Sequence, residues 1–150
     1  MTAPIAASVR YRHTQPGTLM LVMLPIGALA CVAAGYALPV VAARGALWAA
    51  AILLAILTWL FSSLTVEVTA DEIRWHFGPG LLRYRLALAE IETSRVVRNS
   101  WLNGFGIRMR PGFRLYNVSG LDAVELRLRS GDIRRLGSDD AEQLAAALKS

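Results

Sequence analysis

The chain has 150 residues, of which 55% are hydrophobic, and its mean hydropathy is +0.42. This length suits one domain with an appendage, and the composition is more apolar than a soluble domain of this size needs. The single cysteine, Cys31, excludes an intramolecular disulfide and a cysteine-based zinc cluster. All eleven acidic residues lie from Glu67 onward, whereas Arg44 is the one charge between Thr18 and Leu64. The chain therefore divides into a membrane half and a soluble half.

The formal net charge of +5 gives little support for nucleic-acid binding. Arg10, Arg12 and Arg44 belong to the membrane half, and the rest of the chain holds thirteen basic residues against eleven acidic ones. A nucleic-acid-binding domain gathers an excess of positive charge on one face. We therefore expect no nucleic-acid partner.

Two apolar runs follow an N-terminal tail, which is expected to occupy residues 1–17. Residues 18–43 contain no charge over about 26 residues, and residues 46–64 form a second run of about 19. Each is long enough for a helix to cross a hydrocarbon core of about 30 Å. Only Arg44 and Gly45 separate them, which predicts a tight transmembrane hairpin. A signal peptide is the competing interpretation, but its apolar region is typically only about 7–15 residues long.

The placement of arginine predicts the orientation of the hairpin. Arg10 and Arg12 precede the first span, whereas Arg74, Arg83 and Arg85 follow the second within about 20 residues. Positive charge accumulates on the cytoplasmic side of a membrane. We expect both termini in the cytoplasm, with the lipid bilayer as the protein's first partner.

Small residues line one side of each predicted span. Gly27, Cys31 and Gly35 recur at every fourth position in the first span, and Ala51 and Ala55 do so in the second. Such faces let helices approach closely. They can pack within the hairpin, which we favour, or form the seam of a homo-oligomer. Neither span contains an acidic residue or a histidine, which argues against an ion or proton transporter.

The soluble half, residues 65–150, changes to the two-residue period of strands. In EIRWHF, apolar residues such as Trp75 alternate with polar ones, and the next run, LRYRL, turns Arg83 and Arg85 outward. This alternation is typical of half-buried strands. The GPG segment between the runs predicts a turn. We expect Trp75 to lie in the core.

The stretch WLNGFGIRMRPGFRLYNVSG, residues 101–120, has the glycines of a phosphate loop but the pattern of strands and turns. Asn103-Gly104 predicts a hairpin turn, and Pro111-Gly112 predicts a looser one. Between them, Met109 alternates with outward arginines and is expected to face the core. Because residue 109 is methionine, the GxGxxG fingerprint of dinucleotide binding is incomplete.

The remaining segments complete a small sheet with a closing helix. Strands are expected around residues 93–98 and at residues 123–129 and 132–137, with a Ser-Gly turn between the last two. Ser138 or Asp139 can cap a C-terminal amphipathic helix. The soluble half should thus hold about seven short strands followed by one helix.

The segment EIRWHFGPGLLRYRLALAEIETSRVVR resembles the bacterial pleckstrin-homology-like (PH-like) domains that follow a pair of membrane helices. In that family, a strand with Trp and an FG turn lead into an L-x-E-I corner, which here is Leu88, Glu90 and Ile91. GFGIR, YNVSG and LGSDD are similar as well, so the resemblance covers about residues 60–148. It implies a membrane α-helical hairpin plus an α+β domain, an antiparallel PH-like β-barrel of about seven strands closed by a C-terminal helix.

The family resemblance also implies an interaction module at the cytoplasmic face of the bacterial cytoplasmic (inner) membrane, without a catalytic site, but it carries over no binding residues. The basic strand-turn-strand that binds inositides in eukaryotic relatives has no convincing match. Outward arginines form the candidate interaction surface: Arg83, Arg85, Arg108, Arg110 and Arg114. They are either solvated strand faces paired with glutamates, or a surface for anionic lipid headgroups, worth about 1 kcal/mol per residue near the membrane.

The residues offer little other chemistry. The two histidines, His13 and His76, are too few for a zinc site, and we expect no cofactor and no enzymatic activity. We predict a membrane-anchored, non-catalytic interaction module at the cytoplasmic face that binds a protein partner or the inner-leaflet surface. The first alternative is a small oligomeric membrane component of a transport or envelope assembly. The second is an anchored enzyme that uses His76.

Overall fold

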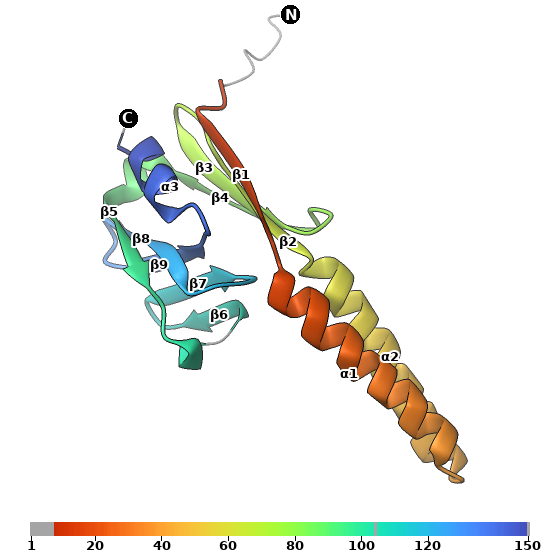
Figure 1. Cartoon of the computed structure of the whole chain (residues 1–150). Coiled ribbons are helices and arrows are strands. Elements are labelled where there is room, and N and C mark those ends of the chain that lie inside the picture. The colour runs from red at the N-terminus through yellow and green to blue at the C-terminus, as the bar shows by residue number, and fades with distance from the viewer. Residues whose placement is uncertain (1–7, 104, 150) are drawn as a thin grey trace, which may run out of the picture.

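A computed structural model of the chain describes residues 8–103 and 105–149. Two helices, α1 (Thr18–Ala37) and α2 (Val41–Leu60), pack along each other and project from a domain of two sheets (Figure 1). Both helices are long and apolar enough to cross a membrane, and only 6% of the residues in the apolar window of each are buried. The helices are therefore not core helices of the domain.

Both helices end earlier than the apolar runs suggested. α1 ends before Pro39, because Leu38 adopts the extended backbone that a following proline favours. Arg44 and Gly45, which we expected to form the turn, instead lie in α2, where the Arg44 Nη2 donates a 2.9 Å hydrogen bond to the Leu38 carbonyl. The connection is residues 38–40. After α2 the chain soon enters a strand, so the second helix does not reach residue 64.

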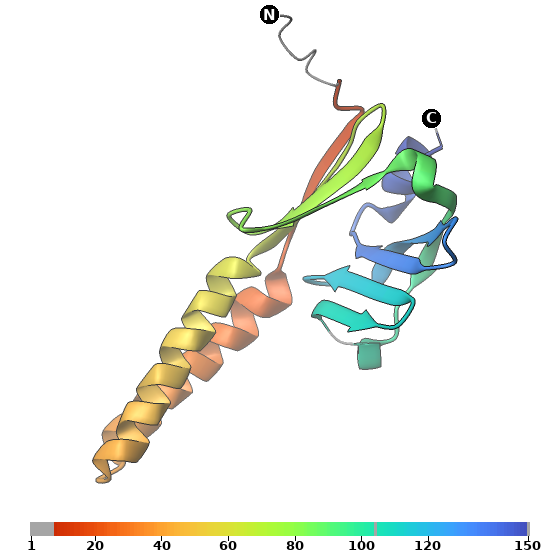
Figure 2. The ribbon, with the colours of Figure 1, turned by 180° about the vertical axis from the view of Figure 1, so that it is seen from behind.

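The first sheet has four antiparallel strands in the order β1-β2-β3-β4. Their bounds are β1 (Tyr11–Pro16), β2 (Ser63–Val68), β3 (Glu72–Phe77) and β4 (Leu82–Ala87). The segment expected as a tail therefore contains a strand, which pairs with β2 along its whole length. Because β1 leads into α1 and β2 follows α2, the helical hairpin leaves one edge of this sheet and returns to it (Figures 1 and 2).

The second sheet has five strands in the order β5-β8-β9-β7-β6. Their bounds are β5 (Ile91–Arg98), β6 (Gly106–Arg110), β7 (Phe113–Asn117), β8 (Asp122–Leu128) and β9 (Ile133–Gly137). Short 3-10 helices precede and follow β5, namely η1 (Leu88–Glu90) and η2 (Trp101–Asn103). The chain closes with α3 (Ala141–Ala147), which packs against β8 and β5. The β7–β9 pair is parallel, and the other pairs of this sheet are antiparallel.

The α+β class with a C-terminal helix is confirmed, but the expected closed antiparallel barrel is not found. The described residues form nine strands in two separate sheets, one of them mixed. Physically, η1 turns the chain out of β4 and into the second sheet. β5 and β6 then lie at opposite edges of that sheet, so the expected Asn103-Gly104 turn does not join a hairpin, and Gly104 itself lies outside the described residues.

The core lies between the inner faces of the two sheets. Trp75 is 1% exposed, as expected, and its ring meets Tyr116 of β7 edge-on, with 5.1 Å between centroids. Met109 differs from the expectation, because its side chain is 59% exposed. It lies on β6, an edge strand that no further strand covers among the described residues.

Candidate interaction surface on the first sheet

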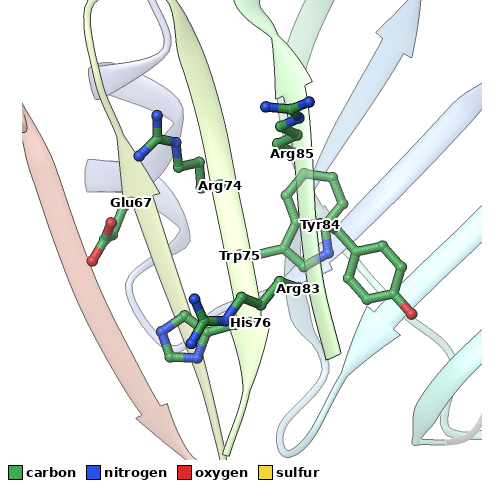
Figure 3. Close-up of a pocket in the computed structure, with 7 residues that line it drawn as sticks. All are labelled: Glu67, Arg74, Trp75, His76, Arg83, Tyr84 and Arg85. Carbon is green, nitrogen blue, oxygen red and sulfur yellow. The ribbon is translucent and has the colours of Figure 1, made fainter. Parts of the chain in front are cut away.

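The outer face of the first sheet carries two rows of polar side chains set by strand register. In one row Arg74 lies opposite both Glu67 and Arg85, and in the next His76 lies opposite both Thr65 and Arg83. Alternate residues of a strand point to opposite faces. Figure 3 accordingly shows Arg74, His76 and Arg83 on one side of the strands, and the rings of Trp75 and Tyr84 on the other.

These rows border an open cleft of about 480 Å³. It is lined by Glu67, Arg74, Trp75, His76, Arg83, Tyr84 and Arg85 (Figure 3). Because Trp75 and Tyr84 send their rings to the core, their backbone forms the floor of the cleft. The charged side chains of the lining are three arginines and one glutamate, so the cleft has an excess of positive charge.

The three arginines of the cleft differ in how far they are already paired. Arg74 forms an ion pair with Glu72 on its own strand, and the Arg83 Nε donates a hydrogen bond to the Gly80 carbonyl. The side chain of Arg85 has no hydrogen bond or ion pair within the described part of the chain. Glu67, the acid of the cleft, is paired with Arg12 at 3.2 Å. Arg85 is therefore the cation most available to a ligand.

The distance of the cleft from the end of α2 follows from the β3–β4 turn and the strand register. The β3–β4 turn abuts the end of α2, where a Cβ on Gly78 would lie 2.6 Å from the Leu60 carbonyl oxygen. Gly78 also has φ of +42°, so both its conformation and its surroundings require glycine. Through Arg74, Arg85 of β4 is in register with Glu67 of β2. Glu67 is four residues along β2 from Ser63, a distance of about 13 Å at 3.3 Å per residue.

The other three arginines of the predicted surface lie elsewhere. Arg108 and Arg110 are exposed on β6, an edge of the second sheet. The positive charge of Arg114 on β7 lies close enough to Tyr84 to affect its pKa, and the ring of Tyr84 is on the inner side of the first sheet. Burial and neighbouring Tyr116 raise the pKa of Tyr84, while Arg114 opposes them. The five arginines therefore do not form one continuous surface, and the first-sheet group comprises only Arg83 and Arg85.

A buried carboxylate on the second sheet organises a different set of arginines. Glu125 is 3% exposed and accepts hydrogen bonds from Arg95 at 2.6 Å and from Arg135 at 2.7 Å. Arg135 also donates to Asn99. Burial alone would raise the pKa of Glu125, but the hydrogen bonds from Arg135 and Arg95 outweigh it and lower that pKa below its ordinary value. This network is structural, since its charges are satisfied within the protein.

The small residues of the helices largely meet the partner helix. A Cβ on Gly27 would lie 3.3 Å from Leu54, and one on Gly35 would lie 2.5 Å from the Trp48 Nε1. Ala51 is buried as well. Cys31 is half-buried, and Ala55 is exposed. Apart from Ala55, the structure places these residues at or near the contact between α1 and α2.

The two histidines, His13 and His76, lie on different strands of the first sheet. The Nε2 atom of His13 on β1 lies 2.6 Å from the Oδ1 atom of Asp139, and the Tyr11 hydroxyl donates a 3.1 Å hydrogen bond to Asp140. These two contacts hold β1 against the start of α3. Burial and neighbouring Asp140 raise the pKa of the Tyr11 phenol. The described residues contain no group of three or more histidine, cysteine or acidic side chains that could hold a metal ion.

Neither a protein-family model, nor a curated protein, nor a solved structure matches this chain. Its function must therefore be argued from its own residues.

Proposed function

We propose that this chain is a membrane-anchored, non-catalytic module whose first sheet binds an acidic segment of a protein partner. The observation that carries the proposal is Arg85, an unpaired cation beside Arg74 and Arg83 in an open cleft. Guanidinium groups bind carboxylates through planar, paired hydrogen bonds. An acidic segment would supply the carboxylates that the cleft itself provides only through Glu67.

Distance favours a protein over the lipid surface as the occupant of this cleft. The row of Arg85 lies about 13 Å beyond the start of β2 at a rise of 3.3 Å per residue. At physiological ionic strength, charges are screened over about 8 Å. Attraction between the Arg85 row and anionic headgroups is therefore weak. The Arg83 row is in register with Thr65, only about 7 Å from Ser63, and lies closer to the headgroups, whereas a partner standing beside the domain reaches both rows.

The anchoring part of the proposal rests on α1 and α2 crossing a membrane together. Pairing of β1 with β2 keeps the segment before α1 and the domain after α2 on the same side. Arginines flank the hairpin on that side, while Arg44 stands alone near the connection. By the positive-inside rule that side is cytoplasmic. We take the membrane to be a bacterial inner membrane because the sequence resembles bacterial PH-like membrane proteins. The similarity to PH-like interaction modules is part of this same proposal.

The alternative of an oligomeric membrane component has less support. Gly27 and Gly35 already lie against Leu54 and Trp48 of α2, so a large part of the small-residue face is used within the hairpin.

Site-directed photocrosslinking of the full chain in its native membrane tests the proposal. Ala87 follows Arg85 on the same face of β4, so p-benzoylphenylalanine at position 87 reports on the cleft while leaving its arginines intact. The matched control is the same residue at Thr93, an exposed position on β5. We expect position 87 to give one discrete protein adduct, lost on adding salt, that position 93 does not give. Adducts with lipid alone, or equal adducts from both positions, would contradict the proposal.

A further inference from the structure

Two large apolar side chains stand exposed at one tip of the second sheet. Trp101 and Leu102 of η2 are 73% and 74% exposed. The turn that carries them is ordered by the Leu102 backbone N–H, which donates to the Ser100 hydroxyl at 3.3 Å. Exposing both side chains to water is unfavourable, because burying them would remove their apolar surface from water.

This tip points toward the side from which the helices extend. In Figures 1 and 2 the short coil after β5 forms the end of the second sheet that lies on the side of the helical hairpin. A second apolar projection, Leu81, is 69% exposed in the β3–β4 turn. That turn touches the carboxyl end of α2 through Gly78. Both projections therefore lie where a membrane crossed by α1 and α2 would have its surface.

The surrounding charge also suits a lipid surface. Residues 93–121 contain five arginines and no acidic residue, although Arg95 is paired with Glu125 and Asp122 lies opposite Arg98 in strand register. Arg98, three residues before Trp101, is exposed at the end of β5 that leads into η2. Aromatic side chains favour the interfacial layer of a bilayer, and nearby arginines favour anionic headgroups.

We propose that Trp101 and Leu102 insert into the interfacial layer of the leaflet that α1 and α2 enter, and so hold the second sheet against the membrane. The inference rests on the proposed anchoring of the hairpin, but not on what binds the cleft. The occupant is the bilayer itself, because the tip is continuous with the end of the domain that the helices already fix at the membrane. Docking in this way fixes the orientation of the domain on the membrane, with the outer face of the first sheet directed away from the bilayer normal.

Spin labelling of the full chain in nanodiscs tests the insertion. A nitroxide is attached at Leu102→Cys in a Cys31→Ser background, in discs containing phosphatidylcholine and phosphatidylglycerol. The matched control is Ser130→Cys, in the β8–β9 turn, because strand register places that turn at the opposite end of the second sheet from η2. Relaxation by lipid-soluble oxygen and by a water-soluble nickel chelate reports the environment of each label.

We expect the label at 102 to be relaxed mainly by oxygen and the label at 130 mainly by the nickel chelate. Replacing Trp101 with Ser should shift the label at 102 toward the nickel chelate without lowering the melting temperature, because the indole is exposed within the domain. A label at 102 that resembles the control, or one shielded from both relaxing agents as in a protein contact, would overturn the insertion. Neither result would affect crosslinking at position 87, so failure of this inference is distinct from failure of the proposed binding cleft.

Discussion

The two sheets differ in how the chain builds them. The second sheet comes from one continuous stretch, Ile91 to Gly137, whereas the first takes β1 from before the helical hairpin and its other strands from after it. The first sheet is therefore part of the attachment to the helices. Its strands continue the direction of the hairpin, while the second sheet forms the opposite wall of the core (Figure 1).

The arginines of the two sheets also meet different surroundings. On the second sheet, Arg95 and Arg135 share the buried Glu125, and their charges are used to hold the fold. On the first sheet, Arg85 faces solvent with no acid bound to it among the described residues. Arg85 thus differs from Arg95 and Arg135 in that no carboxylate among the described residues satisfies its charge, which is the condition that the proposed binding site requires.

Removal of the N-terminal strand should have the largest effect, because the first sheet forms one wall of the core that both sheets share. A fragment of residues 65–150 lacks β1 and the beginning of β2, so we expect no cooperative unfolding transition. A second variant joins Gly17 to Ser62 through Asn-Gly in place of residues 18–61. The Gly17 N–H already donates a 2.8 Å hydrogen bond to the Ser62 carbonyl, which suits a two-residue hairpin turn.

We expect this hairpin variant to be soluble and to melt cooperatively, as followed by circular dichroism. If the 65–150 fragment melts at the same temperature as the hairpin variant, β1 is dispensable and the first sheet is not built as described.

Loss of the aromatic contact between the sheets should come next. Trp75 of β3 meets Tyr116 of β7 and is 1% exposed. In the hairpin variant, Trp75→Ala should lower the free energy of unfolding by about 3–5 kcal/mol, the cost of deleting a large buried side chain. Urea denaturation measures this change. A loss below about 1 kcal/mol, the scale of surface substitutions, would show that the two inner faces do not share one core.

Glu125→Gln tests whether the arginines of the second sheet stabilise the fold through this carboxylate. Removing one partner of a buried ion pair costs about 3–5 kcal/mol, and the lower end applies here because Arg95 is largely exposed. The folded-state pKa of Glu125 is lowered, so its contribution is present above the ordinary value of 4.5 and is lost as the pH falls below it. The stability difference between wild type and variant should therefore shrink on acidification from pH 7. A difference that stays constant to pH 3 would show that Glu125 is not charged in this network.

Much of this fold follows from local patterns. The two apolar runs predict the helices, and alternation around Trp75 predicts β3 and its buried face. The ends of the helices are harder, because hydropathy continues past Pro39 although the proline ends α1. β1 was missed because YRHTQP is polar. Its strand character depends on pairing with β2, which lies beyond the whole hairpin in the sequence.

The candidate site shows the same division between local and distant information. Alternation along β4 predicts that Arg83 and Arg85 point outward. Alternation along β3 also predicts that Arg74 joins them across the hairpin, but it cannot predict that Glu67 does, because that depends on the register of β2 against β3. It also cannot predict that Arg114, an exposed residue of β7, lies near Tyr84 of the first sheet, because sheet order depends on contacts between residues far apart in the chain. Glu125 could have been noted from its place between Val124 and Leu126, but its two arginine partners could not.

The most direct measurement compares two pairs of arginines that are equally spaced on edge strands of the two sheets. Arg83→Gln/Arg85→Gln alters the cleft, and Arg108→Gln/Arg110→Gln makes the same change of charge on β6. Full-length protein in nanodiscs of uncharged phosphatidylcholine is titrated with a fluorescein-labelled polyglutamate peptide. The first pair should weaken binding by about 1–2 kcal/mol, roughly five- to thirtyfold, and the loss should shrink at high salt. The second pair should change it less than about twofold, a difference below 0.5 kcal/mol. Equal losses from the two pairs would contradict a binding site on the first sheet and leave only a general attraction of positive charge.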